Sequence, residues 1–206
     1  MDGQEYLNQI SGVTGGVRNG GRPAWLSSPI FKVLVIGVVG VILMMIVGAI
    51  LGNGGDSFKD RCFGLKLKLD RTISAITDYQ TEVKSSELRS YSASLSGVLS
   101  NTNREFENYL VEKYKYKEKS VAKNITAKAD EDFEELSTEL FTAKINGNLD
   151  RIFAIKMSYE ISLIMAEESS IYAATNNEDL KKMMQTSHES LSNLYENFNG
   201  FSEAKK

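Results

Sequence analysis

The two most reactive side chains belong to Cys62 and His188, each the single residue of its type in the 206-residue chain. A thiol and an imidazole in contact would form a nucleophile–base pair. No flanking motif orients the two, so we interpret Cys62 as a small buried hydrophobe and His188 as a surface residue. A reactive or intermolecular thiol stays open, because nearby basic residues would favour the thiolate. These are Lys59, Arg61 and Lys66.

Metal chemistry lacks the ligands it needs. A di-iron bundle requires a Glu-x-x-His pair on each of two helices, but residue 185 is Gln and the chain has no second histidine. The zinc-protease motif fails for the same reason, although Glu189 follows His188. The acidic run 130–135 lacks the glycine and alternating oxygen ligands of a calcium loop. We therefore predict no catalytic residue, no metal site and no cofactor.

A basic segment, Lys113 to Lys119, alternates lysine with tyrosine over its first half. Such a segment could contact anionic lipid headgroups or another polyanion. The chain as a whole is acidic, with 24 Lys and Arg against 27 Asp and Glu and a net charge of −3. This balance argues against nucleic acid as the main partner.

An uncharged run, Val33 to Leu51, indicates that the chain is anchored in a membrane. A helix of this length covers roughly 28 Å, close to the hydrocarbon thickness of a bilayer. A cleavable signal peptide has a shorter apolar region, and a buried soluble helix rarely has such a long one. We therefore predict a transmembrane signal-anchor helix over 29–53, with residues 30–52 in contact with lipid. The glycine-rich residues 1–28 are expected to form a flexible tail.

Two considerations bear on the orientation of the predicted span, and they favour opposite orientations. Three Lys or Arg residues lie close before the run and five lie close after it, which favours a cytoplasmic C-terminal domain. This rule loses force when a long folded domain follows the span, and ordinary signal-anchor insertion keeps only the short N-terminal tail inside. We predict a single-pass membrane protein whose C-terminal domain lies outside the cytoplasm.

The residues after the run have the composition of a helical domain. Both prolines and twelve of the sixteen glycines lie within residues 1–55. Apolar residues then recur with alternating steps of four and three, the heptad pattern of packed helices. The first such seam comprises Phe58, Cys62, Leu65, Leu69, Thr72, Ile76, Tyr79 and Val83; the last comprises Leu180, Met184, Ser187, Leu191, Leu194, Phe198 and Phe201.

These patterns predict an all-α fold, in which residues 56–201 form an elongated up-and-down bundle of about five helices and residues 202–206 a tail. Ser85 is expected to cap the second helix, and Asn146-Gly147-Asn148 to separate the third from the fourth. The fourth helix, residues 149–174, is apolar on every side and is expected to be central. Gly200 is expected to end the last helix.

The function favoured by this layout is that of a membrane-anchored, non-enzymatic interaction or scaffold module. Its helical seams would contact a protein partner or a second copy of the chain. If the last helix is loosely held, its methionine-containing face is the expected partner surface, since methionine adapts to varied shapes. That face comprises Met183, Met184, Leu191 and Phe198.

The alternative is a small-ligand sensor or carrier with its site inside the bundle. The ligand would lie beside the fourth helix, near Met157, Tyr159 and Met165. An enzyme is the third hypothesis, and it would need a nucleophile–base or carboxylate pair that sequence spacing does not reveal.

Overall fold

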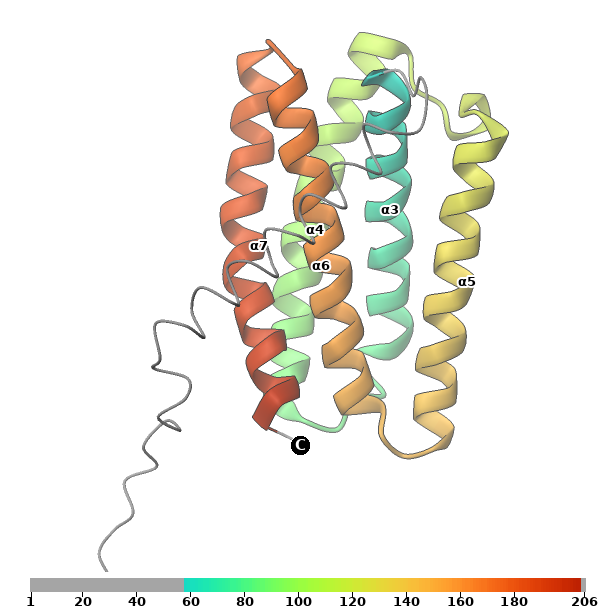
Figure 1. Ribbon diagram of the computed structural model, residues 1–206, viewed down its shortest axis with the longest axis vertical. Coiled ribbons are helices and arrows are strands. Elements are labelled where there is room, and N and C mark those ends of the chain that lie inside the picture. Colours follow the sequence, from blue (N-terminus) through green and yellow to red (C-terminus); the bar gives the residue numbers. More distant parts are fainter. Residues whose placement is uncertain (1–57, 205–206) are drawn as a thin grey trace, which may run out of the picture. The chain divides into compact units, whose positions relative to one another are not determined.

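The computed structural model describes residues 58–204 of the chain (Figure 1). This region consists of five α-helices packed as a bundle, with one short 3-10 helix between α4 and α5, so the predicted all-α bundle is confirmed. The elements are α3 (Phe58–Tyr79), α4 (Ser86–Tyr114), η2 (Glu118–Ser120), α5 (Lys123–Ile145), α6 (Leu149–Ala174) and α7 (Glu178–Ala204).

The predicted tail, 1–28, and the predicted membrane span, 29–53, lie outside the described residues. Within residues 58–204, no helix combines the length and apolar character that crossing a bilayer requires.

Four of the helices close into a ring. Each of α3, α4, α7 and α6 packs against the next, and α6 packs back against α3. Figure 1 shows that successive helices run in opposite directions, so neighbours around the ring are antiparallel. The fifth helix, α5, lies outside the ring and packs against α3 and α6. The bundle is therefore a four-helix core with one flanking helix.

Local sequence explains where the helices begin and end. The Ser85 hydroxyl accepts a hydrogen bond of 3.4 Å from the backbone N–H of Leu88, which confirms the predicted N-cap of α4. Gly147 has φ of 73°, a left-handed conformation that glycine adopts readily, just after α5. Asn148 occupies the N-cap position of α6 but its side chain makes no capping hydrogen bond.

The predicted seams form the core. Every large apolar seam residue is buried or packs against the buried cluster, and Thr72 and Ser187 are buried at their seam positions. The predicted end of the last helix at Gly200 is wrong, because α7 continues to Ala204. The apolar contact of Phe201 with the core accounts for the extra turn. Fully buried large side chains include Phe106, Phe153, Phe198, Leu65, Leu69, Leu95, Leu99 and Leu140.

The predicted central position of residues 149–174 is only partly matched. The helix formed there, α6, contacts α3, α5 and α7, but α3 likewise contacts three helices. Three large apolar or aromatic side chains of α6 remain exposed: Ile155 at 37%, Tyr159 at 56% and Tyr172 at 43%. Its all-round apolar pattern therefore overstated its burial.

Candidate functional site

A short chain of polar groups crosses the apolar core of the ring. The Thr102 hydroxyl of α4 lies 3.1 Å from the Ser187 hydroxyl of α7 and donates a hydrogen bond to it. Glu168 of α6 is fully buried beside them, and neither of its carboxylate oxygens makes a hydrogen bond of regular geometry. The core thus contains a carboxyl group with no basic partner, an arrangement that disfavours its charged form.

The protonation of Glu168 follows from this setting. Burial raises the pKa of its carboxyl group to about 8; the Ser187 hydroxyl opposes the rise, and the negative charge of Glu167 adds to it. The group is therefore mainly neutral at pH 7. A buried acid with a raised pKa is one mark of a catalytic acid or base. Here it faces hydroxyls inside a packed core, so we treat it as a structural group.

A second buried polar region lies where α5 covers α3 and α6. Lys68 of α3 and Glu160 of α6 form a largely buried ion pair of 3.6 Å. Burial raises the pKa of Glu160, Lys68 lowers it, and Asp132 of α5 raises it again. Burial also raises the pKa of the half-buried Glu167 to about 7, with the same opposing contributions from Lys68 and Asp132. Lys68 thus stabilises the charged forms of both Glu160 and Glu167 in this interface.

Ion pairs on the rim of the same interface hold α5 in place. Arg71 of α3 binds Asp130 of α5 at 2.8 Å and Glu118 of η2 at 3.2 Å. Lys156 of α6 pairs with Glu139 of α5. The acidic run 130–135 therefore supplies a partner for α3 through its first residue, Asp130. Among residues 58–204, no group of three His, Cys, Asp or Glu side chains is arranged to hold a metal ion.

The lysines of the α4–α5 connection form an exposed basic surface, here called the lysine corner. Tyr116 is buried, and its ring packs edge-on against Phe63 of α3 at 5.0 Å. Tyr114 makes a similar contact with Phe63 at 6.2 Å. These rings fix the backbone while the intervening lysines point outward and are exposed. The lysine corner comprises Lys113, Lys115, Lys117, Lys119 and Lys123.

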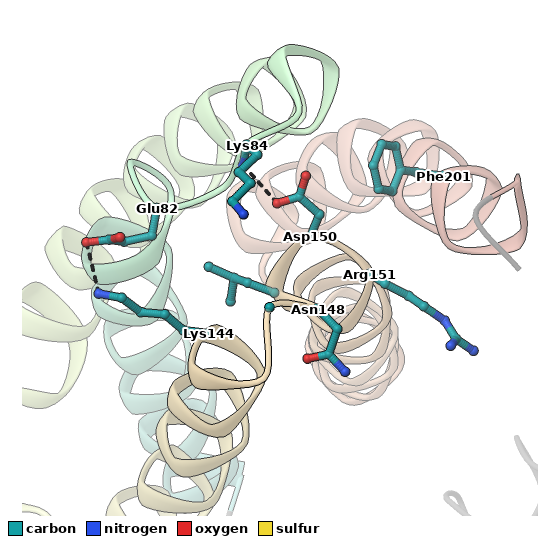
Figure 2. A pocket seen from close by; sticks show the side chains of 9 residues that line it. Glu82, Lys84, Lys144, Asn148, Asp150, Arg151 and Phe201 are labelled. Carbon is teal, nitrogen blue, oxygen red and sulfur yellow. Dashed lines mark hydrogen bonds and ion pairs between the residues drawn. The ribbon is translucent and has the colours of Figure 1, made fainter.

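An open hollow of about 440 Å³ lies at the opposite end of the bundle, where the α3–α4 and α5–α6 loops meet (Figure 2). Its charged groups are largely occupied. Lys144 pairs with Glu82 at 3.1 Å, and the Asp150 carboxylate accepts hydrogen bonds of 2.8 Å from the backbone N–H groups of Lys84 and Ser85. These contacts join the two loops, and they leave few groups to recognise a ligand.

The structure places most of the predicted partner face in the core. Met184, Leu191 and Phe198 are buried between α7 and its neighbours, and Met183 is half-buried against them. In the closed bundle these side chains cannot reach a partner. The prediction that they bind one would require α7 to separate from the ring.

The predicted ligand site is not assembled either. Met157 is fully buried and Met165 is partly buried against the core, whereas Tyr159 points to solvent on another side of α6. The three side chains therefore do not line one cavity.

The remaining candidates, Cys62 and His188, lie on α3 and α7, which are diagonal corners of the ring. Cys62 is buried, as predicted, and burial raises the pKa of its thiol to about 12, with Arg61 opposing the rise. His188 is half-buried. Together with the high thiol pKa, this separation gives no support to a nucleophile–base pair.

Sequence reasoning missed one exposed feature. Phe141 and Ile145, one turn apart on the outer face of α5, are 55% and 68% exposed. The signal was present in the sequence, since neither residue belongs to the seam that buries Leu136, Leu140 and Ala143. Comparison with protein-family models, curated proteins and solved structures finds no match to this chain.

Proposed function

We propose that this chain is a membrane-anchored, non-enzymatic interaction module, displayed outside the cytoplasm, that binds a protein partner through the outer face of α5. The observation that carries the partner site is the exposed pair Phe141 and Ile145. The anchor is inferred from the apolar run Val33 to Leu51 in the sequence.

Phe141 and Ile145 leave apolar surface area in contact with water that a partner could bury. Burying a large apolar side chain stabilises a complex by roughly 1.5–3 kcal/mol. Phe141 and Ile145 are spaced by four residues, so they lie on one face of α5 and can enter one partner groove together. The adjacent Thr138 and Thr142 are also exposed and would border the contact.

The position of the pair fits a role in display. It lies at the C-terminal end of α5, whereas α3 begins at the other end of the bundle (Figure 1). In the sequence, the apolar run precedes Phe58. A span there would hold one end of the bundle near the lipid and direct the other end, with the pair, away from it.

Site-specific photo-cross-linking in intact cells tests the partner site. A photoreactive phenylalanine analogue replaces Phe141 in the full chain, and the control places it at Ser192, an exposed position of α7. We expect a discrete adduct from position 141 that Ile145→Glu abolishes, and none from position 192. Equal labelling from both positions, or none from either with the bundle folded, would reject α5 as the contact surface.

Topology is tested separately. Ser192→Cys supplies an exposed thiol, while the buried Cys62 stays in place. Labelling of intact cells by a membrane-impermeant maleimide is expected if the bundle lies outside the cytoplasm. Labelling only after lysis would place it inside and restrict its partners to cytoplasmic proteins.

A further inference from the structure

We propose that the lysine corner binds the anionic headgroups of the membrane in which the chain is anchored, so that the bundle is held against the lipid in one orientation. This inference rests on the membrane anchor of the proposed function. It adds a lipid-binding surface at the end of the bundle opposite Phe141.

The lysine corner carries positive charges that no acidic side chain of residues 58–204 neutralises in an ion pair. None of the five lysines of the corner forms an ion pair within residues 58–204, and all are exposed. The nearest acidic residue in the connection, Glu118, is engaged by Arg71 at 3.2 Å. Unpaired ammonium groups remain available to lipid phosphates and carboxylates.

The backbone that carries these lysines is held in place by contacts with the rest of the bundle. Lys115 adopts a left-handed conformation with φ of 55° and ends α4. The N–H of Tyr116 donates to the carbonyl oxygen of Leu110 at 3.2 Å, which turns the chain back over α3. Val121 is then buried at the other end of the connection. Anchoring at Tyr116 and Val121 presents the lysines as a surface instead of a loose loop.

The position of the lysine corner also favours contact with lipid. The lysine corner and the start of α3 lie at the same end of the bundle (Figure 1). Six residues, 52–57, separate the apolar run from Phe58. Six residues span at most about 20 Å, so a membrane-inserted run would keep this end of the bundle near the headgroups. The tether raises the effective concentration of lipid at the lysines.

Basic and acidic residues lie on different sides of this end of the bundle. The first turn of α7, at the same end of the bundle, carries Glu178 and Asp179, and Lys181 is paired with Glu178 at 3.0 Å. Contact with an anionic bilayer therefore favours the side of α3, α4 and α5 and disfavours the side of α7. The net charge of −3 on the whole chain favours a local lipid contact over general attraction to nucleic acid.

The test uses the full chain in nanodiscs of phosphatidylcholine, with or without phosphatidylglycerol. A fluorophore on Ser120→Cys, an exposed position of the corner, reports proximity to a quencher on lipid headgroups. We expect strong quenching only with phosphatidylglycerol, and its loss at high salt. Each lysine near the surface shifts the bound population about fivefold, so Lys113→Gln, Lys117→Gln and Lys119→Gln together should lower it on the order of a hundredfold.

The matched control replaces three basic residues at the other end, Lys84, Lys144 and Arg151, by glutamine, and it should leave quenching unchanged. Quenching that ignores lipid charge and both triple variants would overturn the inference while leaving the anchor intact. Binding of a labelled oligonucleotide without any response to phosphatidylglycerol would overturn it in favour of a soluble polyanion. A chain that fails to enter nanodiscs would overturn the anchor and the inference together.

Discussion

The Thr102 hydroxyl of α4 and the Ser187 hydroxyl of α7 meet in a hydrogen bond of 3.1 Å, across a helix interface that is otherwise apolar. Glu168 lies beside them, fully buried. Two hydroxyls can satisfy each other and still face a neutral carboxyl group, but they cannot replace the hydration of a carboxylate. The folded state therefore favours the protonated form of Glu168.

Glu168→Gln is predicted to stabilise the protein near neutral pH. The folded pKa of about 8 lies above the ordinary glutamate pKa of 4.5, so unfolding releases a proton between these values and stability falls as pH rises through them. At pH 7 the variant should gain about 3 kcal/mol in free energy of unfolding. Urea denaturation measured across this pH range checks the prediction.

The matched control for that series is Glu196→Gln, since Glu196 is exposed on α7. It should shift the free energy of unfolding by less than about 0.5 kcal/mol and keep the pH dependence of the parent. A Glu168→Gln variant with the parent's pH dependence would show that Glu168 ionises in the folded state as it does in water.

Lys68→Met is predicted to destabilise the attachment of α5. It removes the cation that lowers the pKa of both Glu160 and Glu167, leaving two carboxylates in a largely buried interface. We expect a loss of about 3 kcal/mol at pH 7. The loss should shrink as pH falls through the raised folded pKa values of these groups, which is about 7 for Glu167, because a protonated carboxyl group no longer depends on the lysine.

The exposed Lys128, which pairs with Asp132 at 3.5 Å, provides the comparison for Lys68. Lys128→Met should cost less than about 0.5 kcal/mol, because solvent screens that pair. Equal effects of the two substitutions in thermal unfolding would argue that Lys68 is hydrated and that the interface is wet.

Substitutions of the buried Phe198 and the exposed Phe141 should distinguish a role in core packing from a role in partner binding. Phe198→Ala should cost about 3–5 kcal/mol, because it opens a cavity among α4, α6 and α7. Phe141→Ala should change stability by less than about 0.5 kcal/mol. Guanidinium denaturation of both variants measures these changes in the free energy of unfolding. A change of less than about 1 kcal/mol for Phe198→Ala would indicate that α7 is loosely held.

Cys62 is predicted to be inert in the native protein. A thiol pKa raised from 9.0 to about 12 lowers the thiolate fraction at neutral pH about a thousandfold, and burial also blocks access. A colorimetric disulfide reagent should titrate no thiol in the native chain and one thiol in denaturant. Rapid native reaction would mean that α3 opens locally.

The buried stripes of the helices could be predicted from the sequence because their apolar residues recur with a regular spacing. Leu65, Leu69 and Ile76 recur with heptad spacing, and burial of that stripe follows from period alone. The capping of α4 by Ser85 and the turn at Gly147 also follow from local chemistry. These features depend only on neighbours along the chain.

Features that depend on contacts between distant segments were not predictable in this way. Lys66 is buried because Asp70 and Glu107 pair with it at 2.7 and 3.2 Å, and the second partner comes from another helix. Tyr159 is exposed because the ring and α5 cover only part of α6, which its apolar pattern does not reveal. The partner face predicted on α7 was assigned from residue type, whereas the ring geometry turns that face inward.

The closed ring also constrains how the protein is made. The last helix in the chain, α7, seals the ring by packing against both α4 and α6. Until it leaves the ribosome, the buried stripe of α4 that includes Leu95 and Phe106 has no cover on one side. The core of the domain can therefore close only after α7 has been synthesised and has packed against α4 and α6.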